Sequence, residues 1–183
     1  MDHGEMVALI RNGVSRGGVW ADLGAGTGNF TWALAELLGP AGTIYAIDRG
    51  ARAIAAQQRR LQSEPPAATI IPRQADVRQP LALPPLDGVL CANLIHFIDD
   101  QIGLLRRLHA MLAPGGQLLV VEYEQARPLP WVPHPLPFAR FVAVAGAAGF
   151  LNPTQVGTRR SPSSGQVLYA AAAHAPATES AGA

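Results

Sequence analysis

The sequence predicts an α/β fold built on a doubly wound, mostly parallel sheet of seven strands. Short apolar runs alternate with stretches of helical periodicity, which is the pattern of a parallel sheet covered on both faces. The last two extended runs, at 154–160 and 166–173, are joined by a short link rich in Ser, Pro and Gly. Such a link cannot hold a crossover helix, so we expect the sheet to end in a reversed, antiparallel β-hairpin.

Each element has its own signals. Phe30, Leu34 and Leu38 recur at helical spacing after the first strand, and Gly39 and Pro40 end that helix. Four prolines between 72 and 85 leave room for a short helix at most, and five between 127 and 137 indicate a loop or lid. The expected strands are 19–23, 43–47, 68–71, 86–92, 117–121, 154–160 and 166–173, and the expected helices are 30–38, 50–62, about 100–112 and 138–150.

Composition limits the partners and the compartment. Charged residues make up 15% of the chain, and its 14 basic residues, all arginine, are balanced by 13 acids to a net charge of +1. Neutralising a nucleic-acid backbone needs a concentrated cationic face, so we expect no nucleic-acid partner. No apolar run reaches the roughly 18 residues that cross a bilayer, and no signal pattern opens the chain. We expect a cytoplasmic protein without a membrane partner, and we keep a homodimer as a candidate assembly.

Length and cysteine content limit the organisation of the chain. A single domain is expected over residues 1–173, because this length suits one hydrophobic core. Residues 174–183 are mostly small and polar and are expected to form a disordered tail. Cys91 is the only cysteine, which excludes an internal disulfide and a cysteine-cluster metal site.

The most informative segment is a glycine-rich turn between the first strand and the first helix. Gly24, Gly26 and Gly28 allow a tight bend and a close approach to a ligand, and the helix that follows offers free N–H groups. Asp22 precedes the turn, where a carboxylate would repel a pyrophosphate but accept hydrogen bonds from an ammonium group. Asp48 ends the second strand, where an acid commonly binds both hydroxyls of a ribose. A ligand with an amino-acid end and a ribose fits this pattern better than a dinucleotide.

Two alternatives to this ligand stay open. The turn has the spacing G-x-G-x-G, and Asn29 stands where a dinucleotide fingerprint would place its third glycine. A nicotinamide-dependent oxidoreductase is therefore the less favoured alternative, and the absence of lysine excludes a Walker phosphate loop. The second alternative is a non-catalytic cofactor-binding or partner-activating subunit of the same fold, because only about 16 residues precede the first strand.

Five segments together resemble the motifs of class I S-adenosylmethionine-dependent methyltransferases. They follow the order of that family over roughly residues 17–173, and the reversed final hairpin also matches. The resemblance implies a Rossmann-like methyltransferase fold and methyl transfer by in-line displacement. It also implies S-adenosylmethionine as cofactor and S-adenosylhomocysteine as product. The segments are VWADLGAGTG at 19–28, IYAID at 44–48, QADV at 74–77, LDGVLCANLIH at 86–96 and LAPGGQLLVV at 112–121.

The resemblance further implies a role for each matching residue of the cofactor site. Asp22 and the glycines Gly24, Gly26 and Gly28 would hold the methionine portion. Asp48 would bind the ribose hydroxyls. Arg49 would lie beside the adenine ring, Asp76 would contact the adenine amino group, and Val77 would contact the ring itself. Asn93 and Leu94 would line the sulfonium side of the pocket.

Candidate acceptor-site residues follow the fourth and fifth strands, at the sheet edge where ligands bind in such folds. His96 is the candidate catalytic base and a candidate substrate contact. A base is needed only if the acceptor arrives protonated. The alternative interpretation is that His96 only caps a helix or lies in a loop. Glu122 and Tyr123 end the fifth strand and are candidates for substrate contact. Trp131 is a further candidate, in a proline-rich segment that is expected to be either a lid with His134 or a surface loop.

The acceptor class is limited by what the sequence lacks. The Asn/Asp-Pro-Pro-aromatic signature of amino-group nucleic-acid methyltransferases does not follow the fourth strand. Asp99 and Asp100 lie where helix caps are expected rather than metal ligands, so we predict no metal. The segment from Asn93 to His96 is similar to that of small-molecule and quinone-type methyltransferases, which implies a small-molecule acceptor.

Overall fold

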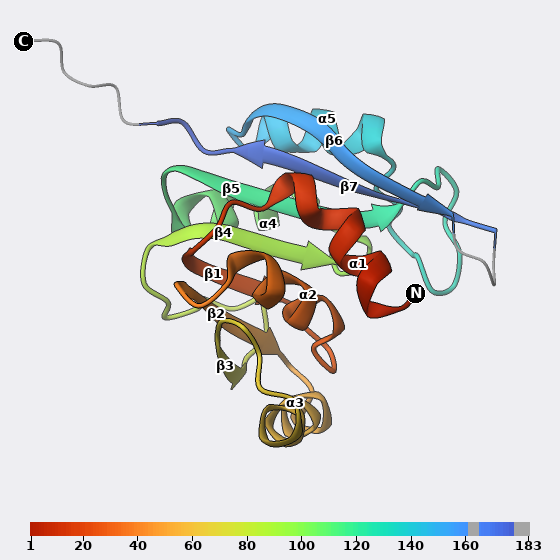
Figure 1. Ribbon diagram of the computed structural model, residues 1–183. Helices are drawn as coiled ribbons and strands as arrows, with labels where there is room; N and C mark the ends of the chain where they lie inside the picture. The colour runs from red at the N-terminus through yellow and green to blue at the C-terminus, as the bar shows by residue number, and fades with distance from the viewer. Residues whose placement is uncertain (161–164, 178–183) are drawn as a thin grey trace, which may run out of the picture.

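Figure 1 shows the computed structural model, in which one twisted sheet carries helices on both faces. The structure describes residues 1–160 and 165–177. The seven strands have the order β3-β2-β1-β4-β5-β7-β6. Strands β1 to β5 are parallel, whereas β7 runs antiparallel to both β5 and β6. This arrangement confirms the doubly wound sheet with a reversed final hairpin.

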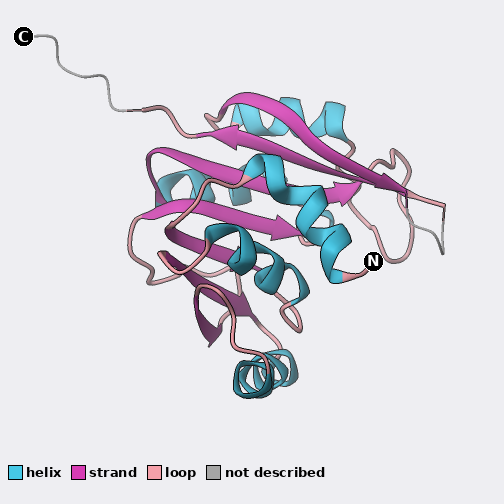
Figure 2. Cartoon of the chain, viewed as in Figure 1, coloured by secondary structure: helices cyan, strands magenta, loops and turns pink. Residues whose placement is uncertain are grey.

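The elements alternate along the chain as the periodicity predicts, and Figure 2 shows this alternation by colour. The strands are β1 (Gly18–Leu23), β2 (Gly42–Asp48), β3 (Thr69–Gln74), β4 (Leu86–Ala92), β5 (Leu112–Tyr123), β6 (Leu151–Arg160) and β7 (Val167–His174). The α-helices are α1 (His3–Ile10), α2 (Asn29–Leu38), α3 (Ala51–Ser63), α4 (Gln101–Met111) and α5 (Phe138–Ala147). Two 3₁₀ turns, η1 (Arg11–Gly13) and η2 (Ile95–Phe97), complete the described elements.

Two apolar layers form the core, one on each face of the sheet. Side chains of α4 and α5 pack on one face, and those of α1 and α2 pack on the other with a contribution from α3. Successive strand residues alternate between the layers, so that Cys91 belongs to the first and Leu90 to the second. The central strands are buried on both faces, as their near-continuous apolar sequences predict.

Strand register brings the ends of the parallel strands together. Leu23 at the end of β1 pairs with Ile47 on β2 and with Cys91 on β4, and Cys91 pairs with Val120 on β5. The segments that follow these strands therefore start side by side, at one edge of the sheet. This carboxyl edge is where the residues singled out by the sequence gather.

Helix α1 and the start of β5 differ from the expected elements. Helix α1 is not among the predicted helices, although Asp2 and Glu5 form a capping box at its start. Strand β5 begins at Leu112 rather than at 117, since Leu112 already pairs with Leu86 on β4. Between β3 and β4 the chain forms no helix, as the four prolines of this region indicate.

The start of the expected tail is hydrogen-bonded to the sheet. His174 is the last residue of β7, and the N–H of the buried Ala175 donates to the Gly116 carbonyl at 2.8 Å. The first residues of the expected tail are therefore held by backbone hydrogen bonds, while residues 178–183 lie outside the described part. Among the described helices, none is long and apolar enough to cross a membrane.

Candidate functional site

The glycine turn joins β1 to α2 at the carboxyl edge. Gly24, Gly26 and Gly28 have φ values of 71°, 54° and 91°. Gly24 donates its N–H to the Ile47 carbonyl of β2 at 2.9 Å, which ties the turn to the neighbouring strand. A Cβ on Gly24 would lie 2.8 Å from the Leu94 side chain, so this position requires glycine for its conformation and for space.

Asp48 fixes the same turn from the end of β2. Its Oδ2 accepts a hydrogen bond from the Gly26 N–H at 2.8 Å, and its Oδ1 accepts one from the Gly50 N–H at 2.7 Å. A carboxylate offers about four acceptor positions, so two backbone bonds leave capacity for ligand hydroxyls. The half-buried carboxylate also lines a cavity, so this capacity lies beside open space.

Asp22 is buried at the end of β1, with 1% of its surface exposed. Thr31 of α2 donates its hydroxyl to Asp22 Oδ2 at 2.6 Å. Burial raises the pKa of Asp22 from 3.8 to about 7; the Thr31 hydrogen bond opposes this rise, and the charge of Asp48 adds to it. A cation bound next to Asp22 would favour its ionised form.

A first cavity of about 280 Å³ opens at the ends of β2 and β3. Asp48, Arg49, Asp76 and Val77 all line it. The Asp76 Oδ1 accepts from the Arg78 N–H at 2.9 Å, which holds this carboxylate at the cavity rim. The structure thus brings together the residues that the resemblance implied for ribose and adenine.

A second cavity of about 390 Å³ lies over the glycine turn and the start of α2. Asp22 and Thr27 line it, together with Met6 of α1. Gly24 and Asn93 line both cavities, so the two spaces meet at these residues. Their combined lining contains the positions implied for the methionine portion and for the sulfonium.

Asn93 has a backbone conformation that few side chains adopt. Its φ is 53°, and its N–H donates to the Val121 carbonyl of β5 at 2.8 Å. Asparagine is one of the residues that tolerate this left-handed region. The bend turns the chain into η2 and places Leu94 in the wall of the first cavity, together with Phe97 and Ile98.

His96 and Glu122 form a buried pair beneath this wall. Their exposed fractions are 2% and 1%, and His96 Nδ1 lies 2.5 Å from Glu122 Oε2. The second oxygen of Glu122 accepts from the N–H groups of Ile95 and His96 at 2.8 and 3.3 Å. The candidate base therefore lines neither of the two cavities.

Substrate contact by Glu122 is not supported by this geometry. A buried carboxylate needs hydrogen-bond donors around it, and both Glu122 oxygens already have donors on η2. The half-buried Tyr123 places its ring 5.9 Å from the ring of His96. Glu122 and Tyr123 thus support η2 rather than line the cavities.

The proline-rich segment packs against η2 as a fixed loop. The His134 N–H donates to the His96 carbonyl at 3.0 Å, and the buried Gln101 donates to the His134 carbonyl at 2.8 Å. Trp131 is 58% exposed and lines neither cavity. The structure thus favours the surface-loop interpretation over the lid.

Phe97, Ile98 and Gln57 are among the residues at the site that the sequence-based candidates do not include. Phe97 ends η2 and Ile98 follows it, and both line the first cavity. Gln57 of α3 donates its Nε2 to the Gly26 carbonyl at 2.7 Å. The sequence does carry a signal for Gln57, since it lies three residues after Ile54, on the apolar face of a helix.

Metal binding finds no support in the described side chains. Among them, no group of three or more His, Cys, Asp or Glu residues is arranged to hold an ion. Asp100 accepts from the Gly103 N–H at 2.8 Å and caps α4, as expected.

Comparison with known proteins identifies related sequences. A family model described as a methyltransferase domain matches residues 21–118. The ubiquinone/menaquinone biosynthesis C-methyltransferase UbiE of Pasteurella multocida is 30% identical over 118 residues, which are 62% of this chain and 43% of that protein. The demethylmenaquinone methyltransferase of a Geobacillus strain is 24% identical over 117 residues, or 64% of this chain and 50% of that protein. The chain spans about half the length of the curated relatives it matches.

Solved structures share the fold over nearly the whole chain. The YcgJ protein of Bacillus subtilis has a TM-score of 0.75 at 11% identity, and the match covers 95% of this chain and 99% of YcgJ. Phosphoethanolamine N-methyltransferase 2 of Haemonchus contortus, solved with phosphomonomethylethanolamine and S-adenosylhomocysteine, has a TM-score of 0.75 at 16% identity. That match covers 94% of this chain and 52% of the Haemonchus protein. At these identities the likeness concerns the fold alone.

Proposed function

The chain belongs to the class I S-adenosylmethionine-dependent methyltransferase family, and on this premise we propose that it transfers a methyl group from S-adenosylmethionine to a small-molecule acceptor. The observation that carries the proposal is the pair of cavities that meet at Gly24 and Asn93. The cofactor has an adenosine half and a methionine half joined at a sulfonium, and the two cavities provide one space for each half.

The residues present fit this cofactor. Asp48 and Asp76 would accept hydrogen bonds from the ribose hydroxyls and the adenine amino group, with Val77 and Arg49 beside the ring. In the second cavity, Asp22 and the glycine turn would hold the methionine portion. Asn93 and Leu94 would lie at the sulfonium.

The cofactor supplies an already activated methyl group, so the protein has to orient the reactants and exclude water. The apolar side chains of Leu94, Phe97 and Ile98 exclude water at the wall of the first cavity. His96 would accept a proton from an acceptor that arrives protonated, with Glu122 holding its ring through Nδ1. The names of the relatives favour a quinone-type acceptor.

The burial of His96 favours one second candidate, a cofactor-binding subunit without catalysis. In that case the two cavities would still hold the cofactor, but the protein would show no turnover. We further propose a single domain over 1–173, a cytoplasmic location without nucleic-acid or membrane partners, and a homodimer as the assembly to test. The small net charge of +1 supports the absence of a nucleic-acid partner.

Titration calorimetry tests the cofactor first. We expect binding of S-adenosylmethionine and S-adenosylhomocysteine and none of NAD; binding of NAD alone would refute the proposal. A panel of small acceptors, including quinols and phenols, is then screened for release of S-adenosylhomocysteine. Cofactor binding without turnover over a broad panel would favour the non-catalytic candidate.

A further inference from the structure

Gln57 supports the glycine turn from the side of α3. Its side chain is completely buried, and its Nε2 donates to the Gly26 carbonyl at 2.7 Å. Its Oε1 is buried without a hydrogen-bond partner among the described residues. An unpaired buried amide oxygen costs free energy that a leucine or methionine of similar size would avoid. The presence of glutamine at this core position is therefore explained by the bond to Gly26.

That bond determines the direction of a neighbouring donor. The Gly26 carbonyl and the Thr27 N–H belong to one trans peptide, in which C=O and N–H point in opposite directions. Because the carbonyl is held towards α3, the Thr27 N–H points away from α3. Thr27 lines the second cavity, and its N–H makes no hydrogen bond within the described part of the chain.

The other N–H groups of the turn are already used. Gly24 and Ala25 donate to Ile47, and Gly26 donates to Asp48. The Gly28 N–H donates to the Ala25 carbonyl at 2.9 Å. Within the described residues, Thr27 is thus the member of the turn whose N–H remains for a ligand.

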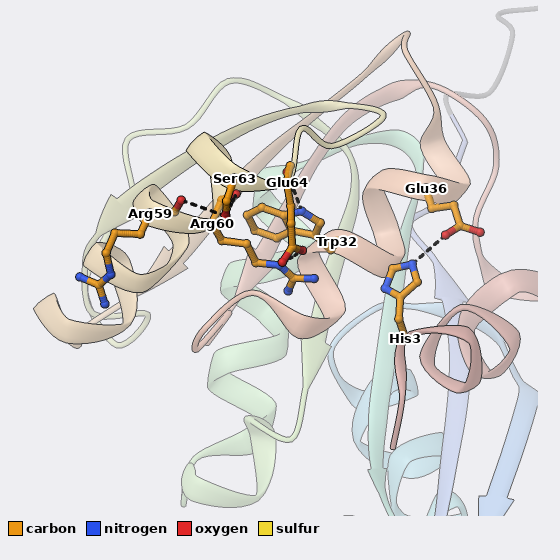
Figure 3. Close-up of polar contacts among 7 residues, drawn as sticks. All are labelled: His3, Trp32, Glu36, Arg59, Arg60, Ser63 and Glu64. Carbon is orange, nitrogen blue, oxygen red and sulfur yellow. Dashed lines mark hydrogen bonds and ion pairs between the residues drawn. The ribbon is translucent and has the colours of Figure 1, made fainter.

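Helix α3, which carries Gln57, is held against α2 by side-chain contacts. Figure 3 shows the contact: Trp32 of α2 donates its indole N–H to the Glu64 carbonyl at 3.2 Å. The Arg60 guanidinium lies 4.3 Å from the centre of the Trp32 ring and bonds the Glu64 carboxylate at 2.7 Å. The same ring lies under the turn, since a Cβ on Gly28 would come within 2.8 Å of it.

We propose that Gln57 is a positioning residue that aims the Thr27 N–H at the carboxylate of the methionine portion of the cofactor. The inference rests on the proposed function. No arginine or histidine side chain lines the second cavity, and its one charged side chain is Asp22. Besides the polar groups of Met1, Thr27 and Asn29, the donors available to a ligand carboxylate there are backbone N–H groups, and the start of α2 adds a favourable dipole.

Two ligands separate this role from a general structural one. S-adenosylhomocysteine carries the carboxylate, whereas 5′-methylthioadenosine has the same adenosine and thioether but no amino-acid portion. Both dissociation constants are measured by calorimetry for wild type, Q57L and, as a matched control, Q101L. Gln101 is also buried and also donates to backbone carbonyls, but it lines neither cavity.

We expect Q57L to raise the Kd of S-adenosylhomocysteine about tenfold, the scale of one lost hydrogen bond to a charged group. The Kd of 5′-methylthioadenosine should not change, and Q101L should leave both values unchanged. An unchanged Kd for S-adenosylhomocysteine in Q57L, or an equal loss for both ligands, would overturn the proposal. If the wild type binds neither S-adenosylmethionine nor S-adenosylhomocysteine, the proposed function itself fails.

The Q57E variant gives a second readout, which also decides the matter if Q57L does not fold. A protonated carboxyl can donate to the Gly26 carbonyl, but an ionised one would repel it. At each pH we compare the affinity of Q57E for S-adenosylhomocysteine with that of wild type. The ratio of the Q57E affinity to the wild-type affinity should therefore approach one at pH 5 and fall as the pH rises to 8. A ratio that is constant over this range would contradict the role of Gln57 as a donor.

Discussion

Replacing the buried Asp22 by asparagine tests the electrostatics of the cofactor edge. In the folded protein, burial raises the pKa of this carboxyl from 3.8 to about 7. The difference between these values corresponds to about 4 kcal/mol, at roughly 1.4 kcal/mol per pKa unit. Asparagine keeps the size of the side chain and an oxygen that can accept from Thr31, but it does not ionise.

The sign of the effect follows from the direction of the pKa change. Below about pH 4, Asp22 is protonated in both the folded and the unfolded chain, and it adds no pH dependence. Between about pH 4 and 7 the folded protein keeps a proton that the unfolded chain has lost, so this group makes the free energy of unfolding fall as pH rises. Above about pH 7 both states are ionised and the penalty of about 4 kcal/mol is complete.

Urea unfolding of wild type and D22N from pH 4 to pH 8 measures the effect. We expect D22N to gain about 4 kcal/mol relative to wild type over this range, because the contributions of the other groups cancel in the difference. The exposed Asp99 provides a control, since a hydrogen bond from the Asp100 N–H lowers its pKa, so D99N should not reproduce this gain. A D22N-to-wild-type difference that is constant from pH 4 to pH 8 would refute the reasoning.

Two further substitutions test the cofactor edge and its support. D48A removes the acceptor of the Gly26 and Gly50 N–H groups as well as the expected ribose contact, so calorimetry should show a loss of about 1–3 kcal/mol in binding of S-adenosylhomocysteine. An unaltered affinity would remove Asp48 from the site. E122L leaves His96 Nδ1 and two backbone N–H groups without their acceptor and should destabilise the fold by about 3–5 kcal/mol in urea unfolding. A loss below about 1 kcal/mol would show that the buried pair is dispensable.

The sheet and its reversed hairpin follow from local features of the sequence. Apolar runs such as 86–92 and 117–121 predict strands buried on both faces, and the short link after 160 excludes a crossover helix. Asp48 follows the run 43–47 directly and Asp76 lies five residues after the run 68–71, so the parallel topology already indicates that they share one edge. Both indeed line the first cavity.

The missed elements depend on contacts between distant segments. Helix α1 is short, and its Met6 and Ile10 become buried only by packing on the second apolar layer. The η2 turn depends on a carboxylate 27 residues away, because Glu122 accepts the N–H of Ile95. Sequence periodicity carries no information about such a partner.

By itself, the sequence determined the order of the elements, the direction of the strands and the edge at which the acids gather. These properties depend on spacing along the chain and on the geometry of parallel strands. The tertiary structure alone decided which polar atoms face a ligand and which face each other. Glu122 points into the interior because η2 supplies hydrogen-bond donors for its buried carboxylate. Gln57 belongs to the site because α3 packs beneath the glycine turn. Hydrogen-bond satisfaction in the interior depends on neighbours that only folding brings together.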